Sequence, residues 1–267
     1  MNPRRLAAVA LRQFYLYAGS PTRLVPLFGW VAIDIALWGF ITRYLNSIAS
    51  PGFDFVPALL GAVLLWDFLT RVMQGISTAF LEDVWSRNFL NIFATPLSIS
   101  EYILGLVITS IGTSLIGLFT MLCLATFAFG LSFLAYGVPI LPFLLVLFLS
   151  GIALGIAGTA MVLRLGPASE WFVWPMPAML SPFVGVFYPV ATLPPWMQVI
   201  SRILPPSYVF EGMRAIVRGV PWNPSTLVIG FLLSIFYIFA AGLFFRHVFR
   251  VAVRTGLLAR YSAESTA

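Results

Sequence analysis

The chain has 267 residues, of which 60% are hydrophobic and only 9% are charged. Because water-soluble domains carry about 25% charged residues, this composition excludes that class and indicates a membrane protein. The formal net charge of +6 comes from 15 arginines and no lysine. These arginines lie beside apolar stretches, which indicates contact with lipid headgroups rather than with nucleic acid.

Two features of the composition exclude particular sites. A Walker A loop requires a lysine that reaches the nucleotide phosphates; this sequence has none, so any ATP and Mg²⁺ must bind to another chain. Cys123 is the single cysteine and lies in an apolar run, which excludes an internal disulfide and a cysteine-based metal site. We therefore expect no cofactor and no metal in this chain.

Residues 1–22 are expected to form a helix that lies in the membrane interface, because a basic face and an apolar face recur at helical spacing. The two faces are Arg4, Arg5 and Arg12, and Leu6, Ala10, Phe14 and Tyr17. A cleaved signal peptide is not expected, since no small-residue cleavage pattern follows the apolar run.

The apolar stretches leave room for six spans of about 20 residues each. We expect five of them at about 24–42, 55–80, 102–129, 140–163 and 227–245. The remaining one, the fifth in chain order, is expected to start near residue 171. Six prolines from Pro175 to Pro195 prevent the fifth from forming one continuous helix. In the fourth, Gly151, Gly155 and Gly158 share one face and permit close helix packing, within the bundle or, alternatively, in a dimer. The sequence thus predicts an all-α polytopic membrane protein in a single domain, 1–267.

Six spans place both termini on one side. Ten arginines fall on that side and four on the other, so the termini, including the tail 249–267, are predicted to be cytoplasmic. The sequence shows no internal repeat, which weighs against the secondary transporters that are built from inverted repeats.

The longest polar interruption runs from Leu81 to Gly105. Its first part has apolar residues at helical spacing and predicts a short amphipathic helix, which ends before Pro96. Ser98 or Ser100 can cap the next helix, with Glu101 in its first turn. This segment, 82–100, is either a helical elbow that receives a push from a soluble partner or a solvated loop, and its local pattern favours neither.

A second unusual segment, 189–219, is too polar to span the membrane. Trp196, Met197, Ile200 and Ile203 form one apolar face, and SYVFEGMRAIVRG predicts a second short helix that stops at Gly219. We expect two re-entrant half-helices at the outer face, where such backbone must be buried in protein or line a wet cavity.

Both segments resemble those of a known family. The elbow, with its ending ATPLSISEYILG, resembles the cytoplasmic coupling segment of ATP-binding cassette (ABC) type-2 permeases. The run SPFVGVFYPVATLPPWMQVISRILPPSYVFEGMRAI resembles their fifth span, a YPV-x-x-LPPW turn and the outer re-entrant helices, and is the more specific match. The ending ILPPSY departs from the asparagine before a single proline that many members have. The resemblance covers nearly the whole chain.

The resemblance implies a mechanism that the composition does not show. Two permease copies, expected as a homodimer in a bacterial inner membrane, would each dock on an ABC ATPase subunit. Closure of the ATPases on ATP would move the elbows and turn the cavity outward, so that a drug, lipid or lipid-linked polysaccharide is exported. The chain itself would then not be an enzyme.

Two alternatives have weaker support. A membrane-embedded lipid-modifying enzyme would need clustered acids or histidines, whereas the nine acids are scattered and His247 is the single histidine. An ion-coupled carrier could use the intramembrane charges Asp34, Asp67 and Arg71 as a relay, but the missing repeat weighs against it.

The candidate functional residues fall into three groups. Asp34 and Arg71 lie at similar depths, and Asp67 is one helical turn from Arg71. These three charges are expected to form a structural ion cluster between the first two spans, or alternatively to contact substrate. In the elbow, Val84, Trp85 and Phe89 are expected to enter a cleft on the ATPase, with Glu82, Asp83 and Arg87 at its rim. At the outer face, the candidate gate consists of Tyr188, Pro189, Trp196, Glu211 and Arg214, in which Glu211 and Arg214 either line the exit or simply pair.

Overall fold

The computed structural model describes residues 2–48, 55–86, 88, 91–92, 94–132, 136–166 and 169–256. Within these ranges the regular structure is helical and no strand occurs. In chain order the elements are α1 (Pro3–Ala18), α2 (Pro21–Ile48), the π-helical turn η1 (Val56–Leu60), α3 (Gly61–Trp85), α5 (Ile99–Phe129), α6 (Ile140–Leu165), α7 (Glu170–Val173), α8 (Met176–Val184), the 3₁₀ turn η4 (Val190–Thr192), α9 (Pro195–Ile203), α10 (Pro205–Val217) and α11 (Pro224–Arg254).

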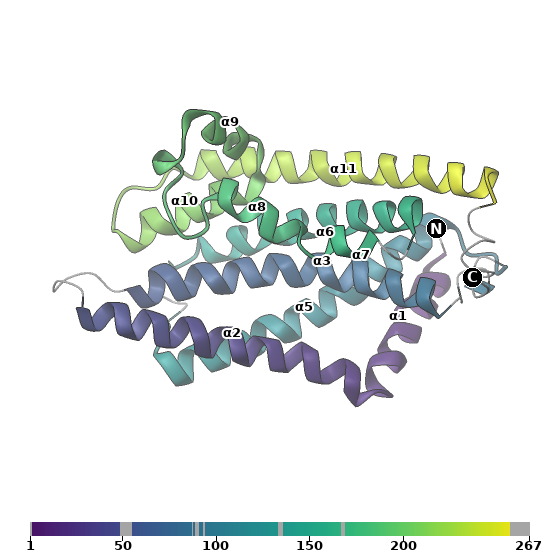
Figure 1. The fold of residues 1–267 in the computed structure, drawn as a ribbon, viewed down its shortest axis with the longest axis horizontal. Coiled ribbons are helices and arrows are strands. Elements are labelled where there is room, and N and C mark those ends of the chain that lie inside the picture. The colour runs from purple at the N-terminus through teal and green to yellow at the C-terminus, as the bar shows by residue number, and fades with distance from the viewer. Residues whose placement is uncertain are drawn as a thin grey trace.

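Five of the described helices are long and apolar enough to cross a membrane: Phe28–Ile48 within α2, Val56–Trp85 across η1 and α3, then α5, α6 and α11. The chain is therefore a multi-pass membrane protein. At the fifth predicted span, the chain instead returns along the bundle as the two short helices α7 and α8 (Figure 1). Pro175 and Pro177 lie at this break, where a missing backbone N–H interrupts the helical hydrogen bonds.

Helix α3 lies at the centre of the bundle. It packs against α5 and α6, while α11 covers α6, and α1 and α2 pack on α5. Figure 1 shows α1 beginning and α11 ending at the same end of the bundle, which we call the proximal end; α9 and α10 lie towards the opposite, distal end. Burial reflects this central position. In an apolar 18-residue stretch of each span, 61% is buried in the span that contains α3, against 22% in α2 and in α11.

The glycine stripe of α6 faces α3 inside the chain. A Cβ atom added at Gly151 would lie 2.7 Å from Cβ of Val72, and one at Gly155 would lie 2.9 Å from Cβ of Ile76. Both distances are shorter than atoms tolerate, so glycine is needed here for the backbones to approach. The stripe therefore serves packing within one bundle, as favoured from the sequence.

Several helix ends follow the predicted signals. The hydroxyl of Ser98 and the carboxylate of Glu101 form a capping box at the start of α5, which confirms the predicted cap. Prolines begin α9 and α10, and Gly219, with φ +66°, follows α10 in the left-handed conformation that ends helices. The two predicted short helices at 194–219 are confirmed.

Two sequence-based boundaries need correction. The residues 81–85 continue α3 to its C-cap at Ser86 rather than beginning a separate amphipathic helix. Helix α1 ends at Ala18 rather than near residue 22, and it packs on α5 through Val9, which lies against Gly105, while Phe14 of the predicted apolar face is largely exposed. In the predicted tail, residues 249–254 are the last turns of α11, and residues 257–267 lie outside the described part.

Candidate functional site

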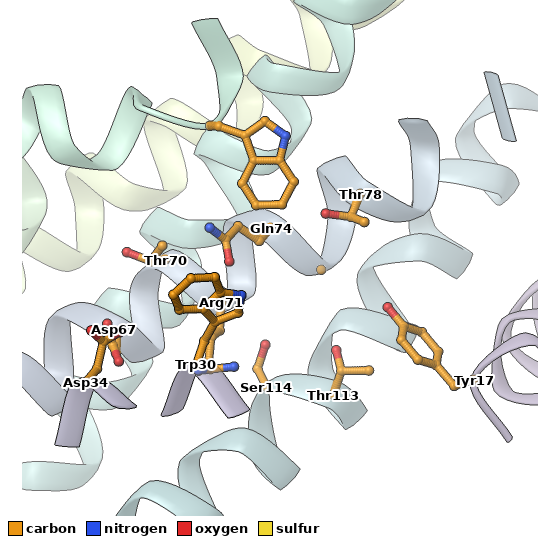
Figure 2. Close-up of a pocket in the computed structure, with 12 residues that line it drawn as sticks. Tyr17, Trp30, Asp34, Asp67, Thr70, Arg71, Gln74, Thr78, Thr113 and Ser114 are labelled. Carbon is orange, nitrogen blue, oxygen red and sulfur yellow. The ribbon is translucent and has the colours of Figure 1, made fainter. Parts of the chain in front are cut away.

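A polar cavity of about 490 Å³ lies among the helices on one side of α3. Figure 2 shows the side chains that line it, contributed by α1, α2, α3 and α5 and by the break between α7 and α8. The lining residues are Tyr17, Trp30, Asp34, Asp67, Thr70, Arg71, Gln74, Gly75, Thr78, Thr113, Ser114 and Trp174. Polar groups at this depth of an apolar bundle are costly and usually have a function.

The cavity runs along α3 from near the proximal end into the bundle. At 1.5 Å per residue, Thr78 lies about 10 Å and Asp67 about 27 Å from the end of α3. The structure thus brings the three predicted intramembrane charges, Asp34, Asp67 and Arg71, to the deep part of one cavity, where they interact electrostatically. Among the described residues, Oδ2 of Asp67 is buried without a hydrogen-bond partner.

The sequence interpretation missed most of the other polar lining. On α3 the missed residues are Thr70, Gln74 and Thr78, which form one face at helical spacing with the predicted Asp67 and Arg71. Thr113 and Ser114 of α5 face them. The signal was present, because polar residues at i, i+3 and i+4 inside an apolar helix predict a face that avoids lipid.

An ion pair at the proximal end ties α1 to α3. Arg12 donates one hydrogen bond of 3.0 Å to Oδ2 of Asp83 and a second, shorter one to Oδ1. Tyr102 of α5 donates to the same Oδ2 at 2.7 Å. Asp83 is 1% exposed, and its hydrogen bonds with Arg12 raise the pKa of that guanidinium. One buried carboxylate therefore joins three helices.

This geometry corrects the role expected for Asp83 and Val84. Asp83 was expected at the rim of a partner's cleft and Val84 inside that cleft, yet both side chains are buried within the chain itself. The physical reason is the pairing with Arg12, which lies 71 positions away and had no local sign in the sequence.

A second contact ties α1 to the start of α5. The carboxylate of Glu101 accepts from the backbone N–H of Asn2 at 2.8 Å and from that of Ser98 at 3.0 Å, and Nη1 of Arg5 lies 3.6 Å away. Helix α1 is thus fixed at both edges of the elbow, at the end of α3 and at the start of α5.

Of the remaining predicted coupling residues, Trp85 is 48% exposed at the end of α3, so its indole is accessible to a partner. Glu82 is partly buried one turn earlier. Arg87 and Phe89 lie outside the described residues.

The candidate gate residues at the distal end form a bonded turn. Arg214 donates to the carbonyl oxygens of Gly185 and Val186 at 2.6 and 3.2 Å, and to Glu211 at 2.7 Å. Glu211 in turn accepts from the backbone N–H of Val190 at 2.7 Å. Burial lowers the pKa of Arg214 from its ordinary value, and Glu211 opposes this effect. The pairing expected between Glu211 and Arg214 is therefore present.

The other gate candidates surround the same turn. The hydroxyl of Tyr188 donates to the carbonyl oxygen of Pro182 at 2.9 Å. The indole of Trp196 packs edge-on against Phe183. Pro189 lines a small cavity of about 170 Å³ together with Arg214 and Arg218. This arrangement holds the α8–α9 connection against α10.

Within the described ranges, no group of three or more histidine, cysteine, aspartate or glutamate side chains lies close enough to hold a metal ion. In the described part of the chain, charged side chains gather at the polar cavity, at the Asp83 ion pair and at the distal turn.

A family model described as ABC-2 type transporter matches residues 4–218. The match extends from the start of α1 to the end of α10 and includes the polar cavity, the elbow and the distal turn. No curated protein matches the chain. Because the family model covers most of the sequence, the chain belongs to the ABC-2 type transporter family, whose members are transmembrane components of transporters.

Proposed function

We propose that the chain is the permease subunit of an ABC exporter, in which a separate ATPase subunit binds ATP and Mg²⁺. Members of this family typically work with such a subunit. The observation that carries the proposal is the course of α3. Its middle lines the polar cavity, and its proximal end carries the buried Asp83 and the exposed Trp85. One continuous helix therefore links the cavity to the surface that a soluble partner would push.

The contacts of α1 support this linkage. Because Arg12 bonds to Asp83 while Asn2 and Arg5 contact Glu101, a displacement of the elbow would move α1, α3 and α5 together. Interfaces and packed cores switch between discrete arrangements rather than deforming continuously. A push at 82–100 would accordingly change the shape of the cavity that these helices line.

The proposal extends to the assembly and its setting. Two copies of this chain, expected as a homodimer in a bacterial inner membrane, would pair with two ATPases, with both termini cytoplasmic. The broken segment α7–α8 would serve as a sixth crossing, and α9 and α10 as outer re-entrant helices. The substrate would be hydrophobic or lipid-linked, exported through the cavity and past the distal turn.

Co-expression with an ABC ATPase that is encoded by a neighbouring gene tests the proposal. The two chains should co-purify and hydrolyse ATP, whereas the permease alone should hydrolyse none, since it has no lysine for a Walker A loop. ATP should drive substrate into inside-out vesicles that contain both chains. Robust hydrolysis by the purified permease alone would overturn the proposal.

A further inference from the structure

The charge of the polar cavity is unbalanced. Among the described residues, its lining contains two carboxylates, Asp34 and Asp67, and one guanidinium, Arg71. When both carboxylates are ionised, the guanidinium can neutralise only one of them, and the lining then keeps one excess negative charge. A buried charge without compensation is costly, so a cation in the cavity would be stabilised.

The hydroxyl groups of the lining add acceptors. Thr70 donates its hydroxyl hydrogen to the carbonyl oxygen of Trp66 at 3.0 Å, and Thr113 donates to that of Ser110 at 3.2 Å or of Thr109 at 3.3 Å. With these hydrogens committed to the helix backbone, only the oxygen lone pairs face the cavity. A ligand that donates hydrogen bonds therefore fits better than one that accepts them.

Ser114 offers a further polar partner for a ligand in the cavity. Its side chain is 1% exposed, and its hydroxyl has no hydrogen-bond partner in the part of the chain that the structure describes. Figure 2 shows this oxygen directed towards the cavity, on the side of Arg71 and Gln74. A buried hydroxyl without a partner costs free energy that a ligand would recover by hydrogen bonding to it, for example an N–H group that donates to its oxygen.

Aromatic rings complete the lining. The indoles of Trp30 and Trp174 are 63% and 46% exposed, and Tyr17 lies at the proximal end of the cavity. Accessible indole faces attract cations and also cover apolar surface. The cavity thus combines a negative, acceptor-rich interior with aromatic walls.

We propose that the cavity binds an amphipathic organic ammonium ion that carries at least one N–H group. The ammonium group bonds to Asp34 or Asp67 and to the oxygens of Thr70 and Ser114, while the apolar part lies on Trp30 and Trp174. This inference rests on the proposed exporter function and names the chemical class of its substrate.

The test compares three probes of equal chain length: dodecylammonium, dodecyltrimethylammonium and dodecyl phosphate. Each probe is titrated into the full chain in neutral maltoside micelles, at a temperature below the melting temperature of the protein. Binding is followed by tryptophan fluorescence and calorimetry. Dodecylammonium should bind most tightly and dodecyl phosphate most weakly. Asp67→Asn should lower the affinity for dodecylammonium about tenfold, because it removes a charge-assisted hydrogen bond.

Three further variants sharpen the comparison. Ser114→Ala keeps every charge and should weaken dodecylammonium but not dodecyltrimethylammonium, which has no N–H to donate. Arg71→Gln removes the competing cation and should strengthen the binding of dodecylammonium. Glu170→Gln, a carboxylate outside the cavity, is the matched control and should change nothing. Melting temperatures identify any variant that does not fold, and Ser114→Ala then carries the test.

Two results would overturn the inference. Tightest binding of dodecyl phosphate, lost in Arg71→Gln, would show an anion site, and equal binding of all probes to every variant would show partition into micelles only. Export by the complex with the ATPase separates the two proposals. If export proceeds while no ammonium probe binds, the proposed substrate class is wrong and the exporter function stands. If the ammonium binds but no ATPase complex forms, the ammonium site stands and the proposed exporter function is wrong.

Discussion

Arg12 in α1 and Asp83 in α3 are 71 positions apart and are joined by two hydrogen bonds at the proximal end of the bundle. The carboxylate is almost fully buried, while the guanidinium is about one third exposed. Removal of the arginine would therefore leave a buried charge that, among the described residues, keeps only the Tyr102 hydroxyl as a hydrogen-bond donor. This pair fixes the interfacial helix to the central helix.

Arg12→Ala should lower the melting temperature of the purified chain, because an unpaired buried carboxylate costs about 3 kcal/mol. Asp83→Ala should also destabilise the chain, whereas Arg4→Ala, an exposed arginine of the same helix, should not. Thermal melts in detergent measure the three variants. Equal melting of Arg12→Ala and Arg4→Ala would show that the pair contributes nothing to stability.

The α3–α6 contact gives a second prediction. Gly151→Ala places a methyl group 2.7 Å from Cβ of Val72 and 2.8 Å from the carbonyl oxygen of Leu69, so overpacking should cost about 1–3 kcal/mol. Gly112→Ala in α5 meets nothing within 4 Å and should be neutral or slightly stabilising, since alanine favours helix. Melting curves that do not separate these two variants would contradict the close packing.

The intramembrane charges give a third prediction. Asp34→Ala or Arg71→Ala should lower stability in detergent, and Asp34→Asn should do so less, because the amide keeps its hydrogen-bonding oxygen. Melting temperature and substrate export are measured for each variant. If both alanine variants melt like the wild type but lose export of particular substrates, the charges contact substrate and do not stabilise the bundle.

The distal turn gives a fourth prediction. Glu211→Ala removes the acceptor of the Val190 N–H, and loss of one hydrogen bond of about 1 kcal/mol should raise local exchange about fivefold. Hydrogen exchange of a peptide that covers 186–193 measures the effect, with Glu170→Ala as the control. Unchanged exchange at Val190 would mean that this bond does not hold the turn.

The sequence predicted features that depend on neighbouring residues. The Ser98–Glu101 capping box is a local motif, and the prolines that begin α9 and α10 act on their own helices. Each could be recognised because its cause lies within four residues of its effect. The same holds for the prolines that break the chain between α7 and α8.

Features that depend on distant residues were not predictable in this way. The acidic pair Glu82 and Asp83 indicated an end to the span, yet α3 continues to Trp85, where Arg12 neutralises Asp83. The residue pattern around Arg12 and the one around Asp83 do not indicate that the two side chains meet across 71 positions. The polar face of α3 is an intermediate case. The spacing of its polar residues could be read from the sequence, but the helices that enclose this face as a cavity could be identified only from the structure.

The last prediction concerns the elbow. Trp85 is the exposed aromatic residue at the end of α3, and Phe89 follows it at helical spacing in the sequence. Aromatic side chains that become buried at the centre of an interface supply most of its energy, whereas charges at the rim contribute little. Trp85→Ala and Phe89→Ala should therefore weaken binding of the ATPase and strongly reduce export, while the permease still folds and inserts.

A pull-down with the ATPase and a vesicle export assay measure both steps. Trp196→Ala, an exposed tryptophan at the distal end, is the matched control and should keep the pull-down. Glu82→Ala should have a smaller effect than the aromatic variants. Asp83→Ala should instead act through the fold, because Asp83 anchors α1 from a buried position. Normal export with both aromatics removed would mean that 82–100 is only a linker, and that coupling passes through α1, which contacts the ends of both α3 and α5.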